Sequence, residues 1–305
     1  MKVRIWGTRG SYPVAAAEML RYGGNTSCVE VRIGDTHIIL DAGTGLRPLG
    51  YAIAKEGSDP RHFHLLITHT HWDHILGFPF FAPIYHPETH LSIYGLQRTQ
   101  SSLHTIIKNA VSDPLLPISL ERLSADLTFH DINHNVCLDL SQDVRVITAQ
   151  VNHPYRALGY RVESVSGVLV YIPDTGPFHT VLFGDERVAW NGHAPKLSLT
   201  EMHTLSAMRE SIIRLAAHAD WLIYDTQFTI EQYNRFPHWG HSTPEQAMEI
   251  AIEAQVRELL LFHHDPHRAD SELDVIGAEQ QARAPANLRV RVAYEGMVLS
   301  RENIQ

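Results

Sequence analysis

Cysteine is scarce in this chain of 305 residues, and long apolar runs and an excess of positive charge are missing. The two cysteines, Cys28 and Cys137, are too few for a disulfide framework and predict reduced thiols in a cytoplasmic protein. No run approaches about 18 apolar residues, and the first residues lack the apolar core of a signal peptide, so we expect no membrane span. The formal net charge of −9 disfavours nonspecific electrostatic binding of nucleic acid over a broad surface.

The chain also lacks low-complexity stretches and Ser/Gly linkers. Its 16 prolines and 19 glycines are spread thinly. We therefore expect one domain over residues 1–305 rather than two joined modules. Residues from about 85 to 140 have no clear periodicity and predict an irregular insertion in that domain, with one helix near 99–110. Long loops of this kind often carry binding function, so the insertion is a candidate for the mouth of a site.

The predicted elements alternate along the chain in a way that favours an α/β fold. Short strands come first, and helices and strands interleave after the insertion. Strands are expected at 3–6, 27–33, 36–40, 63–67, 144–148, 158–163, 168–172, 221–224, 259–262, 288–292 and 296–299, and helices from about 46 to 55, at 203–217, from 243 and at 270–282. Two packed sheets with helices outside them fit this order.

Histidine is unusually frequent, with 21 residues, and one group of histidines stands out. His69, His71, Asp73 and His74 fall within six residues, directly after a predicted buried strand. Alternate residues at a strand end share a side, so His69 and His71 can point together. Imidazole and carboxylate suit zinc and neighbouring metals. A single histidine here would be an ordinary loop residue, but four coinciding donors predict a metal site.

The segment resembles the His-x-His-x-Asp-His motif of the metallo-β-lactamase superfamily. Further segments match that family in the expected order. They are the early turn Asp41–Gly43, the third ligand motif Asn152–Pro154, the bridging-aspartate motif 172–176 and the last histidine motif 261–263. The resemblance runs from Ile5 to about Leu299 and implies a four-layer αββα sandwich with a dinuclear metal site.

The resemblance assigns a ligand set position by position. His69, His71 and His153 would hold one ion. Asp73, His74 and His263 would hold the other, and Asp174 would bridge the two. Asp41 would orient a ligand imidazole from outside. His264 follows His263 directly and could assist or replace it, but we favour His263 because it lies immediately after the apolar strand. The ions would be two divalent metals, Zn²⁺ first, with Mn²⁺ or iron as alternatives.

Three segments resemble one branch of that superfamily, the tRNA 3′-processing endonuclease RNase Z and its phosphodiesterase relatives. The opening segments Gly7–Gly10 and Asn25–Ser27 match that branch. Asp225 follows a strand where the branch carries an acidic residue. Gly240–Thr243 resembles its His-Ser-Thr segment. These matches imply that His241 is a proton donor and that Asp225 orients it. We expect Asp73 to be a catalytic residue together with His241 and Asp225.

The chain departs from RNase Z in having no protruding Gly/Pro-rich arm, and residues 175–200, including Trp190–His193, are expected to be an irregular loop. Together with the charge of −9, this makes tRNA an unfavoured partner and a small-molecule substrate the favoured one. A homodimer is the base-rate expectation for the assembly.

The leading hypothesis is a phosphodiesterase that cleaves a small or cyclic phosphodiester by attack of a metal-bound hydroxide. An acyl hydrolase, such as a lactonase, lactamase or thioesterase, is the alternative on the same fold, and it would not require the Asp225–His241 pair. A noncatalytic metal-binding protein is a third reading, but it predicts the loss of a ligand, and none is missing.

Overall fold

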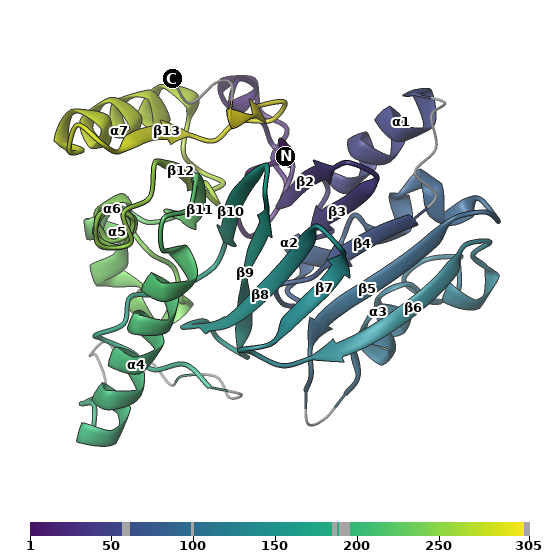
Figure 1. Cartoon of the computed structure of the whole chain (residues 1–305), viewed down its shortest axis with the longest axis horizontal. Coiled ribbons are helices and arrows are strands. Elements are labelled where there is room, and N and C mark those ends of the chain that lie inside the picture. Colours follow the sequence, from purple (N-terminus) through teal and green to yellow (C-terminus); the bar gives the residue numbers. More distant parts are fainter. Residues whose placement is uncertain (57–61, 99–100, 185–187, 189–195, 302–305) are drawn as a thin grey trace.

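Two seven-stranded sheets form the body of the protein in a computed structural model that describes residues 1–56, 62–98, 101–184, 188 and 196–301. The first sheet has the order β14-β1-β2-β3-β4-β5-β6, and the second has the order β13-β12-β11-β10-β9-β8-β7. The two sheets therefore divide the chain roughly into its first and second halves, except that β14 returns to the first sheet (Figure 1).

The first sheet begins with an antiparallel meander. β1, β2 and β3 pair in this way, and the turn at Gly34, which has a φ of 54°, joins β2 to β3 as the Gly-Asp pair predicts. From β3 onward each strand pairs in parallel with the next, through to β6. The strands are β1 (Lys2–Gly7), β2 (Cys28–Ile33), β3 (Thr36–Leu40), β4 (His62–Leu66), β5 (His90–Leu96), β6 (Asp126–Ile132) and β14 (Val298–Leu299).

The second sheet is antiparallel from β7 to β10 and parallel from β10 to β13. β11 and β12 are buried along their whole length, as their near-continuous apolar sequences predict. The strands are β7 (Cys137–Ser141), β8 (Val144–Val151), β9 (Ala157–Ser164), β10 (Gly167–Ile172), β11 (Trp221–Asp225), β12 (Glu258–Phe262) and β13 (Arg289–Val292).

Three apolar clusters show how the layers pack. The central cluster joins strands of both sheets, with Ile5 and Leu40 on one side and Tyr171 and Phe262 on the other. A second cluster packs helices on the outer face of the second sheet, and a third packs helices on the outer face of the first. These layers confirm the predicted αββα architecture.

The helices lie on the outside, as Figure 1 shows. α4, α6 and α7 cover the second sheet, while α1 and α3 cover the first. The helices are α1 (Leu46–Glu56), α2 (Trp72–Ile75), α3 (Leu103–Ala110), α4 (Leu199–Ala216), α5 (Ile230–Arg235), α6 (Pro244–Glu253) and α7 (Asp270–Arg283). Thr243 caps α6, and Pro244 is its first residue, as the sequence predicts.

The expectation of irregular chain over 85–140 is wrong for its secondary structure. This segment contains β5, α3, β6 and β7, and these strands extend both sheets. β5 and β6 alternate apolar and polar residues, with Leu91, Ile93, Leu127 and Phe129 packed toward α3. Their other face carries histidine, serine and aspartate. This polar composition made the segment resemble a loop in the sequence. Residues 185–187 and 189–195, which include Trp190–His193, lie outside the described part of the chain.

Among the residues that the structure describes, no helix combines the length and apolar character needed to cross a bilayer.

Candidate metal centre

The predicted site residues follow the carboxyl ends of strands that run in the same direction. Asp41 follows β3 and His69 follows β4 shortly after its end. His153, Asp174 and His263 come just after β8, β10 and β12. Because these ends meet at one edge of the two sheets, side chains from distant parts of the sequence converge there. His263 and Asp41 both have positive φ values, near 60°, at the point where the chain leaves its strand.

The first group of candidate ligands consists of His69, His71, His153 and Asp174. His71 Nδ1 lies 2.9 Å from His69 Nε2 and 3.2 Å from His153 Nε2. Asp174 Oδ2 lies 3.3 Å from His69 Nε2 and 3.6 Å from His153 Nε2. A tetrahedral ion with bonds of about 2.0–2.1 Å places its ligand atoms roughly 3.3–3.4 Å apart, so these spacings suit a small divalent ion.

The second group consists of Asp73, His74, Asp174 and His263. His74 Nε2 lies 3.3 Å from Asp73 Oδ2 and 3.2 Å from Asp174 Oδ2. His263 Nε2 lies 3.1 Å from Asp73 Oδ2 and 2.8 Å from Asp174 Oδ1. Asp174 belongs to both groups, which is the place that a bridging carboxylate would take.

Asp41 orients the histidine of the second group from outside. Its Oδ2 accepts hydrogen bonds from His74 Nδ1 at 2.8 Å and from the Tyr171 hydroxyl at 2.9 Å. Its carboxylate also accepts from the backbone N–H and the hydroxyl of Thr68. Since His74 donates from Nδ1, its Nε2 carries a lone pair directed at the candidate site.

Three more hydrogen bonds leave ligand nitrogens with free lone pairs. His153 Nδ1 donates to the Gly240 carbonyl at 2.8 Å, and His263 Nδ1 donates to Gln227 Oε1 at 2.9 Å. Thr68 Oγ1, whose hydrogen goes to Asp41, accepts from His69 Nδ1 at 3.1 Å. In each ring the opposite nitrogen, Nε2, faces the cluster as an acceptor.

The pKa values of the histidines in the cluster shift in opposite directions. Burial lowers the pKa of His153 to about 3 and lowers that of His69 well below its ordinary value. Burial alone would do the same to His263, but the Asp174 carboxylate outweighs it and raises the pKa of His263 to about 10. Without an ion, His263 thus holds a proton against the two carboxylates of the second group, and a bound cation would take the place of that proton.

Two buried atoms support a cation more directly. His74 Nε2 and Asp174 Oδ1 make no well-directed hydrogen bond within the described ranges, although His263 Nε2 lies 2.8 Å from Asp174 Oδ1. Both are acceptors, and an unsatisfied buried acceptor costs free energy unless something fills it. A lone pair that faces two carboxylates at 3.2–3.3 Å is repelled by them. A divalent ion among these atoms would satisfy both, so the residues fit the metal pair that the sequence predicts.

His241 and Asp225 stand beside the two ligand groups. His241 Nδ1 donates to Asp225 Oδ2 at 2.9 Å, and both side chains are buried. Asp225 also accepts from the backbone N–H groups of Thr175 and Gln227. The His241 ring lies 5.5 Å from the His153 ring and 5.2 Å from the His263 ring, measured between centroids. The structure therefore brings the predicted proton donor to the metal ligands.

His264 points away from the site. Its Nε2 donates to the Ala293 carbonyl at 2.8 Å, and its own carbonyl accepts from the Gly10 N–H. Among the described residues, His263 rather than His264 joins a candidate ligand group. The structure thus favours the first of the two histidines that the sequence left open.

Two residues that hydrogen-bond to candidate ligands were not identified from the sequence. Gln227 holds His263, and its Nε2 donates to Ser11 Oγ at 3.2 Å. The Ser11 backbone N–H donates to Asp73 Oδ2 at 2.8 Å. Gln227 lies two residues beyond Asp225 at the same strand end, so that position was the available signal. Ser11 had no signal beyond following the Gly7–Gly10 motif.

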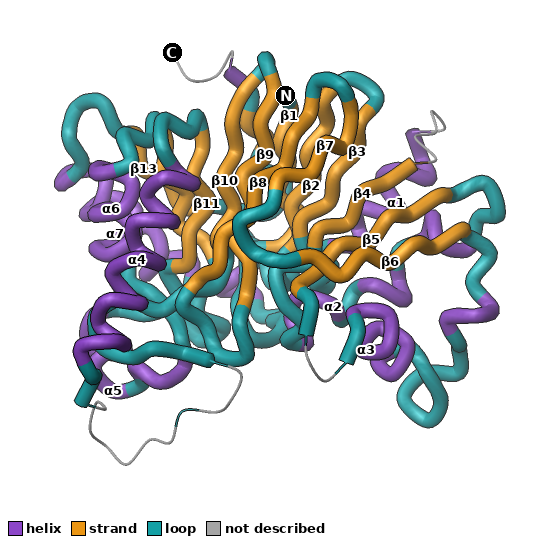
Figure 2. Tube along the Cα trace, turned by 60° about the horizontal axis from the view of Figure 1, so that its bottom comes forward, coloured by secondary structure: helices purple, strands orange, loops and turns teal. Residues whose placement is uncertain are grey.

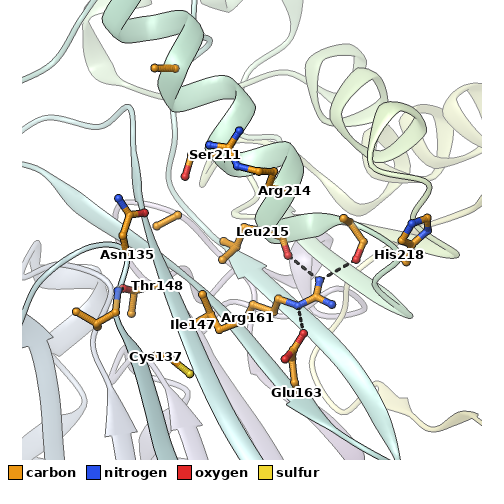
Figure 3. A pocket seen from close by; sticks show the side chains of 14 residues that line it. Asn135, Cys137, Ile147, Thr148, Arg161, Glu163, Ser211, Arg214, Leu215 and His218 are labelled. Carbon is orange, nitrogen blue, oxygen red and sulfur yellow. Dashed lines mark hydrogen bonds and ion pairs between the residues drawn. The ribbon is translucent and has the colours of Figure 1, made fainter.

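A separate cavity of about 800 Å³ lies between α4 and the strands β7, β8 and β9 (Figure 3). Arg161 crosses it, donating to Glu163 and to the carbonyls of Leu215 and Ala217. None of the candidate ligands lines this cavity. Its central cation is engaged in holding α4 to the sheet, so the cavity is distinct from the metal centre.

Comparison with known proteins agrees with this geometry. Ribonuclease Z of Haloarcula marismortui is 23% identical, and the match covers 97% of this chain and 96% of that protein. The metallo-beta-lactamase fold protein YhfI of Bacillus subtilis has a TM-score of 0.66 at 21% identity and 98% coverage of both chains. Human tRNase Z, short form, has a TM-score of 0.65 at 18% identity, covering 98% of this chain and 99% of that one.

A family model bears on the assignment more directly. The model described as the beta-lactamase superfamily domain matches residues 36–190, about half of the chain, and the match includes the His69–His74 motif, His153 and Asp174. With the two ligand groups and the αββα layers, this shows that the chain belongs to the beta-lactamase superfamily.

Proposed function

We propose that this protein is a dinuclear metal-dependent hydrolase that cleaves a small or cyclic phosphodiester. One observation supports it most: the buried His241–Asp225 pair lies beside two groups of converging metal ligands. Phosphodiester cleavage needs a proton for the departing alkoxide, and a histidine held by a carboxylate is suited to give it.

The candidate ligands divide into two sites that share Asp174. His69, His71 and His153 would hold one ion, and Asp73, His74 and His263 would hold the other. When bound, such ions activate water and offset the charge that develops on a phosphoryl group. Zn²⁺ suits the histidine-rich set, while the shared carboxylate also suits Mn²⁺ or iron.

Side chains of the protein would supply the proton and hold the reacting groups in position. Water adds to phosphorus, and the P–O bond to the leaving group breaks. His241 gives its proton to the leaving oxygen, and water restores that proton. Asp225 fixes the imidazole through Nδ1, so that Nε2 is the nitrogen left for the proton transfer. Asp73, a candidate ligand, also accepts from the Ser11 N–H, which fixes its orientation.

RNA is the competing substrate, because relatives that cover most of this chain are named Ribonuclease Z. The charge of −9 favours a small substrate instead, since binding to an RNA backbone gains affinity from many Lys and Arg contacts. A lactone, lactam or thioester substrate would leave the His241–Asp225 pair without an evident use.

A substrate panel tests the proposal. The metal-loaded protein would be assayed with bis(p-nitrophenyl) phosphate, a cyclic nucleotide, a precursor tRNA, nitrocefin, a lactone and a thioester. We expect turnover of the phosphodiesters and a kcat/KM for the precursor tRNA well below that of the best small substrate. Preferential cleavage of the precursor tRNA would replace the small-substrate assignment. Turnover of the acyl substrates alone would replace the phosphodiesterase assignment.

A further inference from the structure

An apolar cavity of about 420 Å³ adjoins the segment that carries the metal ligands. Thr70 and Trp72 form part of its wall, and they alternate along the chain with His69, His71 and Asp73. The opposite wall comes from α3 and the loop that follows it. Figure 2 shows α2 and α3 close together at the same end of the first sheet. Trp72, in the cavity wall, is therefore bonded directly to two candidate metal ligands, His71 and Asp73.

The cavity is apolar and is not a closed void in the core. Of its twelve lining residues none is charged, and only Thr70 and Asn109 are polar. Three large apolar side chains remain exposed around it: Trp72 at 67%, Leu115 at 61% and Phe80 at 47%. Apolar surface gathered in this way around a hollow marks a place where an apolar group binds.

The position of the cavity favours the substrate as its occupant. Neighbouring Cα atoms are about 3.8 Å apart, so Trp72 lies within one residue of both His71 and Asp73. None of the candidate ligands lines the cavity itself, but a group seated against Trp72 would lie next to the segment that carries four of them. A volume of about 420 Å³ falls within the range of small-molecule pockets, and the uncharged lining does not suit a phosphate backbone.

We infer that this cavity holds the apolar ester group of the substrate, an alkyl or aryl group that stays on the phosphate when the leaving group departs. The inference rests on the proposed phosphodiesterase function and names its substrate class: an asymmetric phosphodiester with one uncharged, apolar arm. It also gives residues 106–116 the specificity role that the sequence suggested for the 85–140 segment.

Two substrates with the same leaving group test the inference. p-Nitrophenyl hexyl phosphate and p-nitrophenyl methyl phosphate differ only in the retained alkyl group. Each methylene that becomes buried favours the longer substrate by about fourfold, which corresponds to about 0.8 kcal/mol. Burial of three methylenes would give a preference of roughly 50-fold in kcat/KM, and we expect at least tenfold for the wild-type protein.

Ala110→Phe fills the cavity from α3 and should bring this preference close to one while metal analysis shows both ions retained. Ala207→Phe is the matched control, because Ala207 lines the separate cavity beside α4. It should keep the full preference for the hexyl substrate. A wild-type protein without a preference, or an Ala110→Phe variant that keeps it, would overturn the inference.

A binding measurement separates this inference from the proposed activity. Calorimetry with hexyl methylphosphonate and methyl methylphosphonate needs no turnover. Tighter binding of the hexyl compound that is lost in Ala110→Phe would support the cavity even if no phosphodiester is cleaved. Equal binding of both compounds would reject it even if bis(p-nitrophenyl) phosphate is hydrolysed. A dimer that dissociates only in Ala110→Phe would instead assign the apolar surface to a second copy of the chain.

Discussion

His241 reaches the candidate metal ligands without belonging to either main ligand group. Its Nδ1 is engaged by Asp225, and its ring lies 5.5 Å from the His153 ring and 5.2 Å from the His263 ring. A third grouping of candidate donors does include His241, with Asp174, Asp225 and His263. The residue could thus serve as a proton donor or as a ligand, and these two roles give different results on substitution.

We predict that His241→Ala keeps both ions and the fold but slows hydrolysis. Loss of a positioned proton donor costs about 10²–10⁴-fold with an alkoxide leaving group. The deficit should shrink with p-nitrophenolate, which scarcely needs a proton. Asp225→Asn should give a smaller deficit of the same pattern, since it disturbs orientation alone. The measurements are kcat/KM with both leaving groups and the metal content of each variant.

His203→Ala provides a control for these measurements, because His203 is exposed on α4. It should leave both rates unchanged. If His241→Ala loses an ion, the residue is a ligand and the proton-donor role is wrong. If the variant cleaves substrates with both leaving-group types at the wild-type rate, the proposed phosphodiesterase mechanism is wrong. An acyl hydrolase would then be the better hypothesis.

At the scale of elements, the loop after β1 packs tightly against the second ligand group. A Cβ on Gly10 would lie 2.5 Å from His263 Nδ1 and 2.8 Å from Gln227 Oε1. Those two atoms form the hydrogen bond that directs His263 toward the site. Only glycine leaves room for that hydrogen bond, which gives a physical reason for the Gly7–Gly10 opening of the chain.

Gly10→Ala should therefore weaken metal binding by about 10–100-fold, the usual effect of disturbing a contact that orients a ligand. Competition with a chelating dye measures the affinity. Gly184→Ala is the matched control, because nothing lies within 4 Å of a Cβ built there. Equal affinities of the two variants would show that the His263–Gln227 hydrogen bond does not control the second ion.

Four of the candidate ligands could be predicted from the sequence because each follows a strand that is recognisable alone. β4, β8, β10 and β12 are all regular, and His69, His153, Asp174 and His263 come shortly after their ends. The fold supplies the convergence, since the carboxyl ends of these strands meet at one edge. The structure therefore brings together the residues named from the family motif, and Asp174 belongs to both ligand groups.

β5, β6 and β7 escaped prediction for a physical reason. β6 and β7 are edge strands with no fully buried face, as their largely exposed patterns show. β5 buries Leu91 and Ile93 on one face, but His90, Ser92 and Tyr94 alternate with them, so its composition resembles that of a loop. Gln227 and Ser11 escaped for another reason: their roles depend on tertiary hydrogen bonds, which leave no local pattern in the sequence.

For the whole molecule, the cluster links the two sheets. Its donors come from both halves of the chain, so bound ions would connect β4 of the first sheet with β8, β10 and β12 of the second. Removing the ions would leave Asp73 and Asp174 buried in one cluster, with only the imidazoles of His74 and His263 to offset their charge. Anything that binds only the folded state stabilises it, which couples the metals to the stability of the sandwich.

We predict that chelation lowers the melting temperature by roughly 5–15 °C, since ligands at a large excess over Kd stabilise by about 4 kcal/mol. Calorimetry before and after treatment with a chelator measures the shift, and restoring the metal should reverse it. His71→Ala should show a smaller shift, because it removes a donor of the first group. An identical melting temperature with and without chelator would mean that no ion bridges the sheets.

Reconstitution of the metal-free protein tests the central claim most directly. Zn²⁺ or Mn²⁺ would be added in steps from zero to three equivalents per chain, and hydrolysis of bis(p-nitrophenyl) phosphate would be followed at each step. The two ligand groups that share Asp174 predict that activity rises until two ions are bound and then stays constant. Full activity with one bound ion, or no hydrolysis at any stoichiometry, would contradict a dinuclear phosphodiesterase.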